Sequence, residues 1–264
     1  MIDLKKYRES PAFAMLLLVG AILQFTGCAG PVSHVEILAA IKPLAPGRAW
    51  QLERAAYRKL GKVLFGPGQH VVVTPLSDLS ATEPSIFDES IGNVSLIGKN
   101  PMQLREDAAK IRAKFYRSFS QLSVRHIDRK RTEIISAVVA SAWRFRDDPP
   151  GTEKVLIILS TGFEQSGLLN MGDVSLNLRT ESPYVLEALR RRGLVPSLLG
   201  VKVCMIGITA GQNGLVDTNT ALAVRSFWDS YFRAAGAQLV DFSPTISATC
   251  LKTVRRSDIF AESQ

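Results

Sequence analysis

The sequence predicts an α/β protein with a mainly parallel, doubly wound sheet flanked by helices. Three observations lead to this fold class. Short continuous apolar segments are typical of parallel strands buried on both faces, amphipathic segments of helical period lie between them, and turn residues mark most boundaries. The 264 residues are 46% hydrophobic, which is enough for a sizeable core and excludes a wholly disordered chain.

The first half of the chain supplies a strand and three helices. Residues 50–60 form a short expected helix that ends at Gly61, and residues 70–74 (HVVVT) form an unbroken apolar strand. Residues 101–122 give the clearest helix, because apolar side chains recur there every three or four positions and basic side chains cover the other side. Residues 132–145 form the next helix, which ends at a run of aspartate, proline and glycine.

The second half continues the alternation of strand and helix. Strands are expected at residues 155–159, 201–208 and 239–242. Helices are expected at residues 183–192, with proline near the first turn, and at residues 218–235. Strands that alternate with helices in this way indicate parallel strands joined by helical crossovers.

The N-terminus is typical of a secretory signal. Basic residues precede an apolar run at residues 12–25, which is shorter than the ~20 residues that span a bilayer. Thr26, Gly27 and Cys28 follow this run and resemble the end of a bacterial lipobox. The resemblance implies that Cys28 carries fatty acyl chains such as palmitate and becomes the mature N-terminus; the alternative is a plain signal anchor with a chance cysteine. Ala29, in place of aspartate, resembles lipoproteins sorted to the outer membrane.

These features predict three regions. Residues 1–27 are expected to be a lipoprotein signal peptide, and residues 28–47, with three prolines, a tether. Residues 48–264 are expected to form one α/β domain without internal repeats. We therefore expect an outer membrane lipoprotein that faces the periplasm.

The few cysteines and histidines limit the chemistry. Cys204 and Cys250 can pair in an oxidising periplasm, although Cys204 can equally be a core residue of an apolar strand. His34 in the tether and His70 at a strand start have no evident catalytic partner, and His126 lies among basic residues. A catalytic scheme that needs several histidines is not expected.

An oxygen-rich loop follows the strand at 70–74. It carries Asp78, Ser80 and Thr82 in a D-x-S-x-T pattern, and one carboxylate with two hydroxyls suits a hard cation such as Mg²⁺. Serine and aspartate also gather in loops for turn chemistry, so the pattern is weak by itself.

Two later segments make the chain resemble the von Willebrand factor A family, over about residues 69–242. Thr132 opens the helix at 132–145, and Ser160-Thr161-Gly162 ends the strand at 155–159. The family's metal-ion-dependent adhesion site joins D-x-S-x-S, a threonine at a later helix start and the aspartate of a strand-end T-D-G. Residues 203–208 also resemble the family's V-x-x-I-G-I strand.

By this resemblance the metal ligands are Asp78, Ser80, Thr82 and Thr132, with Thr161 in place of the usual aspartate. That replacement leaves one certain carboxylate, and Glu164 and Asp173 are the candidates to supply another. The alternative is that these residues cap helices and turns in a metal-free descendant. Mg²⁺ binding and the metal-free site both remain open.

The expected function is protein–protein interaction at the cell envelope, as in an accessory subunit of a secretion or conjugation apparatus. We expect no enzyme, because the sequence contains no G-x-S-x-G elbow and no evident nucleophile–base pair. The alternative is a periplasmic hydrolase that uses Asp78 and Glu164 at the strand carboxyl ends.

The expected partners are another envelope protein and, through the lipid anchor, the membrane. The net charge of +8 permits contact with acidic surfaces. No aromatic residues interleave the basic runs at 125–131 and 190–192, so nucleic acid is not an expected partner.

Overall fold

The computed structural model describes residues 32–40, 48–77, 80–92, 100–124, 131–172, 177–207, 210–211, 214–215 and 218–255. The chain divides into two compact units, Met1–Gly30 and Pro31–Gln264. All of the described residues belong to the second unit.

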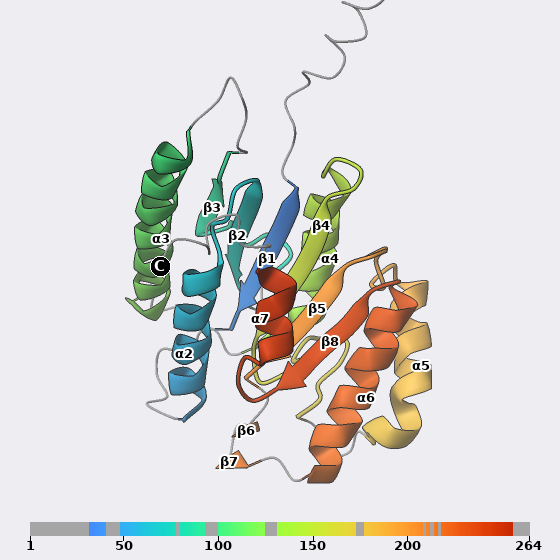
Figure 1. The fold of residues 1–264 in the computed structure, drawn as a ribbon. Coiled ribbons are helices and arrows are strands. Elements are labelled where there is room, and N and C mark those ends of the chain that lie inside the picture. Colours follow the sequence, from blue (N-terminus) through green and yellow to red (C-terminus); the bar gives the residue numbers. More distant parts are fainter. Residues whose placement is uncertain are drawn as a thin grey trace, which may run out of the picture. The chain divides into compact units, whose positions relative to one another are not determined.

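A six-stranded sheet forms the centre of this unit, in the order β3-β2-β1-β4-β5-β8 (Figure 1). The strands are β1 (Ser33–Ala39), β2 (Gln69–Pro75), β3 (Phe87–Ser90), β4 (Glu153–Leu159), β5 (Lys202–Ile206) and β8 (Gln238–Ser243). β3 is antiparallel to β2, and the other neighbours are parallel. A separate two-stranded hairpin consists of β6 (Ala210–Gly211) and β7 (Gly214–Leu215). The predicted fold class is confirmed.

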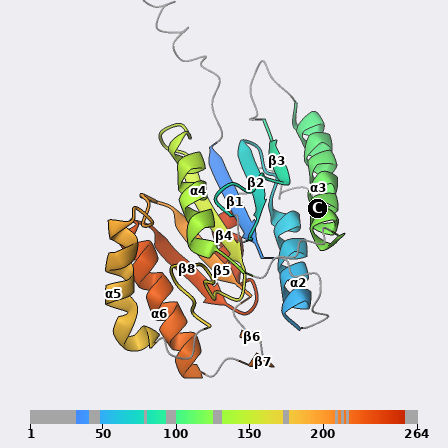
Figure 2. The same ribbon diagram turned by 180° about the vertical axis from the view of Figure 1, so that it is seen from behind.

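Helices cover both faces of the sheet. One face carries α2 (Arg48–Val63), α3 (Pro101–Val124) and α7 (Ala248–Val254) (Figure 1). The opposite face carries α4 (Ile134–Arg146), α5 (Leu178–Arg191) and α6 (Thr218–Ala234) (Figure 2). Each face has its own apolar core, because successive strand residues point to opposite sides. Among the described residues, no helix is both long and apolar enough to cross a membrane.

The first strand corrects the predicted domain boundary. Residues 33–39 were expected in the tether at 28–47, yet they form β1, which pairs with β2 on one side and β4 on the other. This segment forms a strand because its side chains alternate between the two faces of the sheet. Val35, Ile37 and Ala39 point into one core, and the intervening residues point to the other face. The compact unit therefore begins near Pro31 and not at residue 48.

Several short elements and two helix boundaries also differ from the sequence prediction. β3, β6, β7 and α7 were not expected. α2 does not end at Gly61 but continues to Val63, and α5 begins at Leu178, five residues before its predicted start. Asn177 accounts for the earlier start, because its side chain accepts a hydrogen bond from the backbone N–H of Arg179. Pro183 consequently lies inside the helix.

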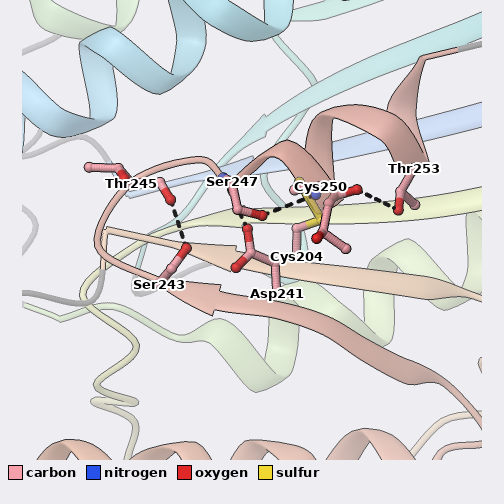
Figure 3. Close-up of a disulfide and its surroundings, with 8 residues drawn as sticks. Cys204, Asp241, Ser243, Thr245, Ser247, Cys250 and Thr253 are labelled. Carbon is pink, nitrogen blue, oxygen red and sulfur yellow. Dashed lines mark hydrogen bonds between the residues drawn. A yellow bond between two sulfur atoms is a disulfide. The ribbon is translucent and has the colours of Figure 1, made fainter.

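A disulfide joins Cys204 of β5 to Cys250 of α7 (Figure 3). The two Cα atoms are 6.1 Å apart, within the usual range for a disulfide. α7 begins beside this bond, where the side chain of Ser247 accepts from the N–H of Cys250 at 3.2 Å. Of the two alternatives that the sequence left open, the structure has the paired cysteines, and the bond holds α7 against the sheet.

Candidate functional site

Three segments meet where the parallel strands end, at what we call the carboxyl edge: the loop after β2, the start of α4 and the loop after β4. Backbone hydrogen bonds join them. The N–H of Glu133 donates to the carbonyl of Ser77 at 3.1 Å, and the N–H of Gln165 donates to the carbonyl of Thr132 at 2.9 Å. The segments that carry the predicted metal ligands are therefore adjacent, as expected for loops after parallel strands.

Glu164 connects two of these segments through its side chain. The fully buried carboxylate accepts hydrogen bonds at one oxygen, Oε2, from the N–H groups of Ile134 (2.7 Å) and Ile135 (3.0 Å). It thereby caps α4, whose own N-cap residue, Glu133, makes no side-chain cap. The other oxygen, Oε1, has no hydrogen-bond partner among the described residues. Burial raises the pKa of Glu164 to about 7, although the N–H of Ile135, the Ser166 side chain and the N–H of Ile134 favour the ionised form.

The described ligand candidates take different positions at this edge. Ser80 is buried, and its hydroxyl accepts from the N–H of Ser77 (2.8 Å) and donates to the carbonyl of the same residue (2.7 Å). Thr132 is also buried, Thr161 is partly buried and Thr82 is exposed. Ser80 thus performs the turn chemistry that the metal-free alternative describes.

Several of the sequence predictions lie outside the described part of the chain. These are the signal peptide at 1–27, Cys28 as the expected lipidation site, Asp78 as the predicted charged ligand, His126, and Asp173 as the candidate second carboxylate. Metal binding at the carboxyl edge and lipidation both stay predictions.

A second polar group lies at the opposite end of the sheet, and we call it the amino-edge cluster. His34 of β1 is in direct register with His70 of β2 on one side and Lys154 of β4 on the other. The two imidazole rings lie 4.4 Å apart between centroids. No catalytic partner was evident for either histidine in the sequence, and the structure places a carboxylate beside each ring. His34 Nδ1 lies 3.0 Å from both carboxylate oxygens of Asp148, and His70 Nε2 lies 2.7 Å from Asp88 Oδ1.

Glu36 extends this cluster along β1, on the face that α4 covers. It is fully buried, and the Nε of Arg144 donates to its Oε2 at 3.0 Å, while Arg144 Nη2 also donates to Oε1. The hydroxyl of Thr74 donates to Oε1 at 3.0 Å. Burial disfavours the carboxylate, but the contacts with His34 and Arg144 outweigh it and hold the pKa of Glu36 below its ordinary value.

Comparison with known proteins assigns no family. No family model matches the sequence, and no curated protein matches it. One solved structure with a similar arrangement is the pilus adhesin SpaC from Lactobacillus rhamnosus GG in its open conformation, at 11% identity and a TM-score of 0.42. The match covers 85% of this chain but 29% of the adhesin, so the chain spans less than a third of that protein's length.

Proposed function

We propose that the protein is a lipid-anchored envelope protein whose von Willebrand factor A-like domain binds another envelope protein through the carboxyl edge. In this role it serves as an accessory subunit of a secretion or conjugation apparatus. Cys28 is the acylated residue that fixes the protein to the outer membrane on its periplasmic side.

The observation that carries the proposal is the fixed arrangement of the carboxyl-edge loops. The backbone bonds at Glu133 and Gln165, together with the buried Glu164, hold three loops in one surface. A preformed surface is favourable for binding, because little conformational entropy is lost when the partner docks. Leu168, on the loop after β4, is half-exposed and offers an apolar contact at this surface.

The disulfide supports an envelope location. Cysteine pairs form and persist in oxidising compartments such as the bacterial periplasm and are rare in the cytosol. A domain in which a disulfide between Cys204 and Cys250 links β5 to α7 therefore suits a secreted lipoprotein.

The docking proposed here does not depend on a resident Mg²⁺ ion. Of the predicted ligands, the Ser80 hydroxyl is already engaged as donor and as acceptor with the backbone of Ser77. Glu164, the candidate additional carboxylate, has one oxygen committed to the start of α4. A hard cation prefers six or more oxygen ligands, and the described donors do not offer that set.

A pull-down with the full-length chain from detergent-solubilised membranes tests the proposal. Leu168→Asp should reduce recovery of the partner at least ~tenfold, because it places a charge in the apolar contact. Leu199→Asp is the matched control, since Leu199 is also exposed but precedes β5 at the opposite edge. Chelator should leave recovery unchanged. Equal recovery by both variants would contradict docking at the carboxyl edge, and turnover in a hydrolase substrate screen without any specific partner would favour the enzyme alternative.

The anchor has its own test. Mass spectrometry of the mature protein should show an acylated Cys28 at the N-terminus, and Cys28→Ser should release the protein from the membrane fraction. An intact Met1 on the mature protein would exclude the lipoprotein.

A further inference from the structure

We propose that the amino-edge cluster binds one divalent transition-metal ion of the Zn²⁺ type through His34, His70 and Asp148. One ring nitrogen of each histidine and one carboxylate oxygen of Asp148 lie within 4.8 Å of one another. The three residues come from β1, β2 and the segment after α4, so the fold brings together ligands that are far apart in the sequence. The proposal does not rest on the docking function, which concerns the other edge of the sheet.

The distances between the proposed ligand atoms suit a small ion after minor side-chain movement. Zinc takes imidazole nitrogen at about 2.0–2.1 Å and carboxylate oxygen at about 2.0–2.2 Å, so two ligands of a tetrahedral ion lie about 3.3–3.5 Å apart. His34 Nδ1 and the Asp148 oxygens are 3.0 Å apart, close to this separation. The ligand atoms lie up to 4.8 Å apart, so the third ligand, from His70, needs to approach by up to about 1.5 Å, and side-chain rotation can supply this without moving the paired strands.

The second nitrogen of each ring faces a carboxylate, as is usual for metal-bound histidines. His70 Nε2 contacts Asp88 at 2.7 Å, which leaves Nδ1 of that ring for an ion. Among the described residues His34 Nε2 is buried without a hydrogen-bond partner, and Glu36 Oε2 lies 3.8 Å from it. Ligation through Nδ1 would leave Nε2 protonated, so that it donates toward Glu36.

The surrounding charges accommodate an added cation. Asp148, Glu36 and Asp88 face the two rings, against Arg144 of α4 and Lys154 of β4. Arg144 is paired with Glu36, and Lys154 Nζ lies 3.9 Å from Asp148 Oδ2. With neutral imidazoles the five charged side chains sum to one negative charge, so a divalent ion leaves one positive charge. A single Zn²⁺ therefore creates no large uncompensated charge in the cluster.

The burial of the proposed ligands indicates that the ion would have a structural role. His34 and Asp148 are only 2% and 7% exposed, which leaves little room for a substrate, whereas His70 at 21% opens the site to solvent and gives the ion a route in. An ion held here would tie the end of α4 to the starts of β1 and β2, on the face seen in Figure 2. Water reaching the site past His70 would complete the coordination.

Metal titration of the full-length protein tests the site. The chain is purified in detergent, stripped with chelator and titrated with Zn²⁺ alone by calorimetry, and Co²⁺ absorption then reports the ligand geometry. We expect one Zn²⁺ per chain, a tetrahedral Co²⁺ spectrum and a thermal midpoint that rises with Zn²⁺. His70→Gln and Asp148→Asn should each weaken binding by about a hundredfold, and Asp88→Asn by about tenfold.

Asp147→Asn is the matched control, because the neighbouring Asp147 is 78% exposed and is not one of the three proposed ligands. It should bind Zn²⁺ like the wild type. If Asp148→Asn does not fold, the partly exposed His70→Gln decides the question. Absence of stoichiometric Zn²⁺ binding to the wild type, or unchanged binding by His70→Gln, would overturn the proposal.

Discussion

Glu164 makes the stability of the protein depend on pH in a direction that one substitution can reveal. Its carboxyl group is fully buried, and one oxygen accepts two backbone hydrogen bonds while the other has no partner among the described residues. Burial raises the pKa in the folded state from the ordinary 4.5 to about 7. The neutral form is therefore favoured by folding.

The sign and size of this pH dependence follow from proton linkage. Between about pH 4.5 and pH 7 the folded state binds more protons than the unfolded state, so the free energy of unfolding falls as pH rises through this window. The full effect is about 3 kcal/mol, of which roughly 2.5 kcal/mol should be lost between about pH 5 and pH 8. Glu164→Gln resembles the protonated acid, because it keeps a neutral oxygen for Ile134 and Ile135 and never ionises. It should therefore be more stable than the wild type at about pH 8 and nearly equal to it at about pH 4.5.

Urea unfolding of both proteins at a series of pH values, with the disulfide intact, measures this difference. Subtracting the two curves removes the titration of groups that the proteins share. Glu187→Gln serves as control, because Glu187 is exposed and its substitution should change stability little at any pH. A difference between Glu164→Gln and wild type that does not change with pH would refute the reasoning. It would mean that the start of α4 keeps the acid ionised despite its burial.

Three further predictions concern stability, each measured by chemical denaturation at neutral pH. Cys250→Ser should lower the free energy of unfolding by about 4 kcal/mol, since the bond to Cys204 closes a loop with a sequence separation of 46; an unchanged midpoint would show that α7 needs no staple. Gly207→Ala should cost about 1–3 kcal/mol, because the glycine has φ +103° and its added Cβ would lie 3.0 Å from a backbone oxygen at the end of β4; a neutral result would mean that this edge relaxes freely. Arg144→Met should cost about 3–5 kcal/mol by leaving the Glu36 charge buried, and adding Glu36→Gln should recover most of this loss; additive losses would show that the two residues are not coupled.

The sequence predicted the parts of the fold whose signal is local. Continuous apolar runs located β4 and β5, and the helical period of α3 gave its position to within two residues at its end. β1 was missed because polar His34 and Glu36 interrupt its apolar residues and three prolines surround it. The short, polar segment of β3 carries almost no strand signal of its own, and its place comes from pairing with β2.

The two edges of the sheet differ in how far the sequence could predict them. Contact between the loop at Ser77 and the start of α4 at Glu133 follows from topology, because a helix that leads into the parallel strand β4 begins at the edge where the parallel strands end. The pairing of His34 with His70 depends on strand register, and the contact with Asp148 depends on where α4 ends. Neither the strand register nor the end of α4 is encoded by a local sequence pattern, so a cluster of this kind can be found only once the strands are placed.

The fold does not require polar side chains on the face of β1 that α4 covers. Toward its carboxyl end the same face of the strand is apolar, with Leu38 packed in the core that α4 covers, whereas Glu36 and His34 occupy the other positions. A buried ion pair is commonly replaceable by apolar residues without loss of stability, so stability alone does not account for Glu36 and Arg144. Holding His34 in one orientation beside His70 does account for them, since Glu36 faces the ring nitrogen that Asp148 does not contact. The variant Glu36→Gln/Arg144→Met should therefore remain folded while losing Zn²⁺ affinity by about ten- to a hundredfold. A folded double variant with wild-type Zn²⁺ affinity would show that these charges serve neither the fold nor the ion.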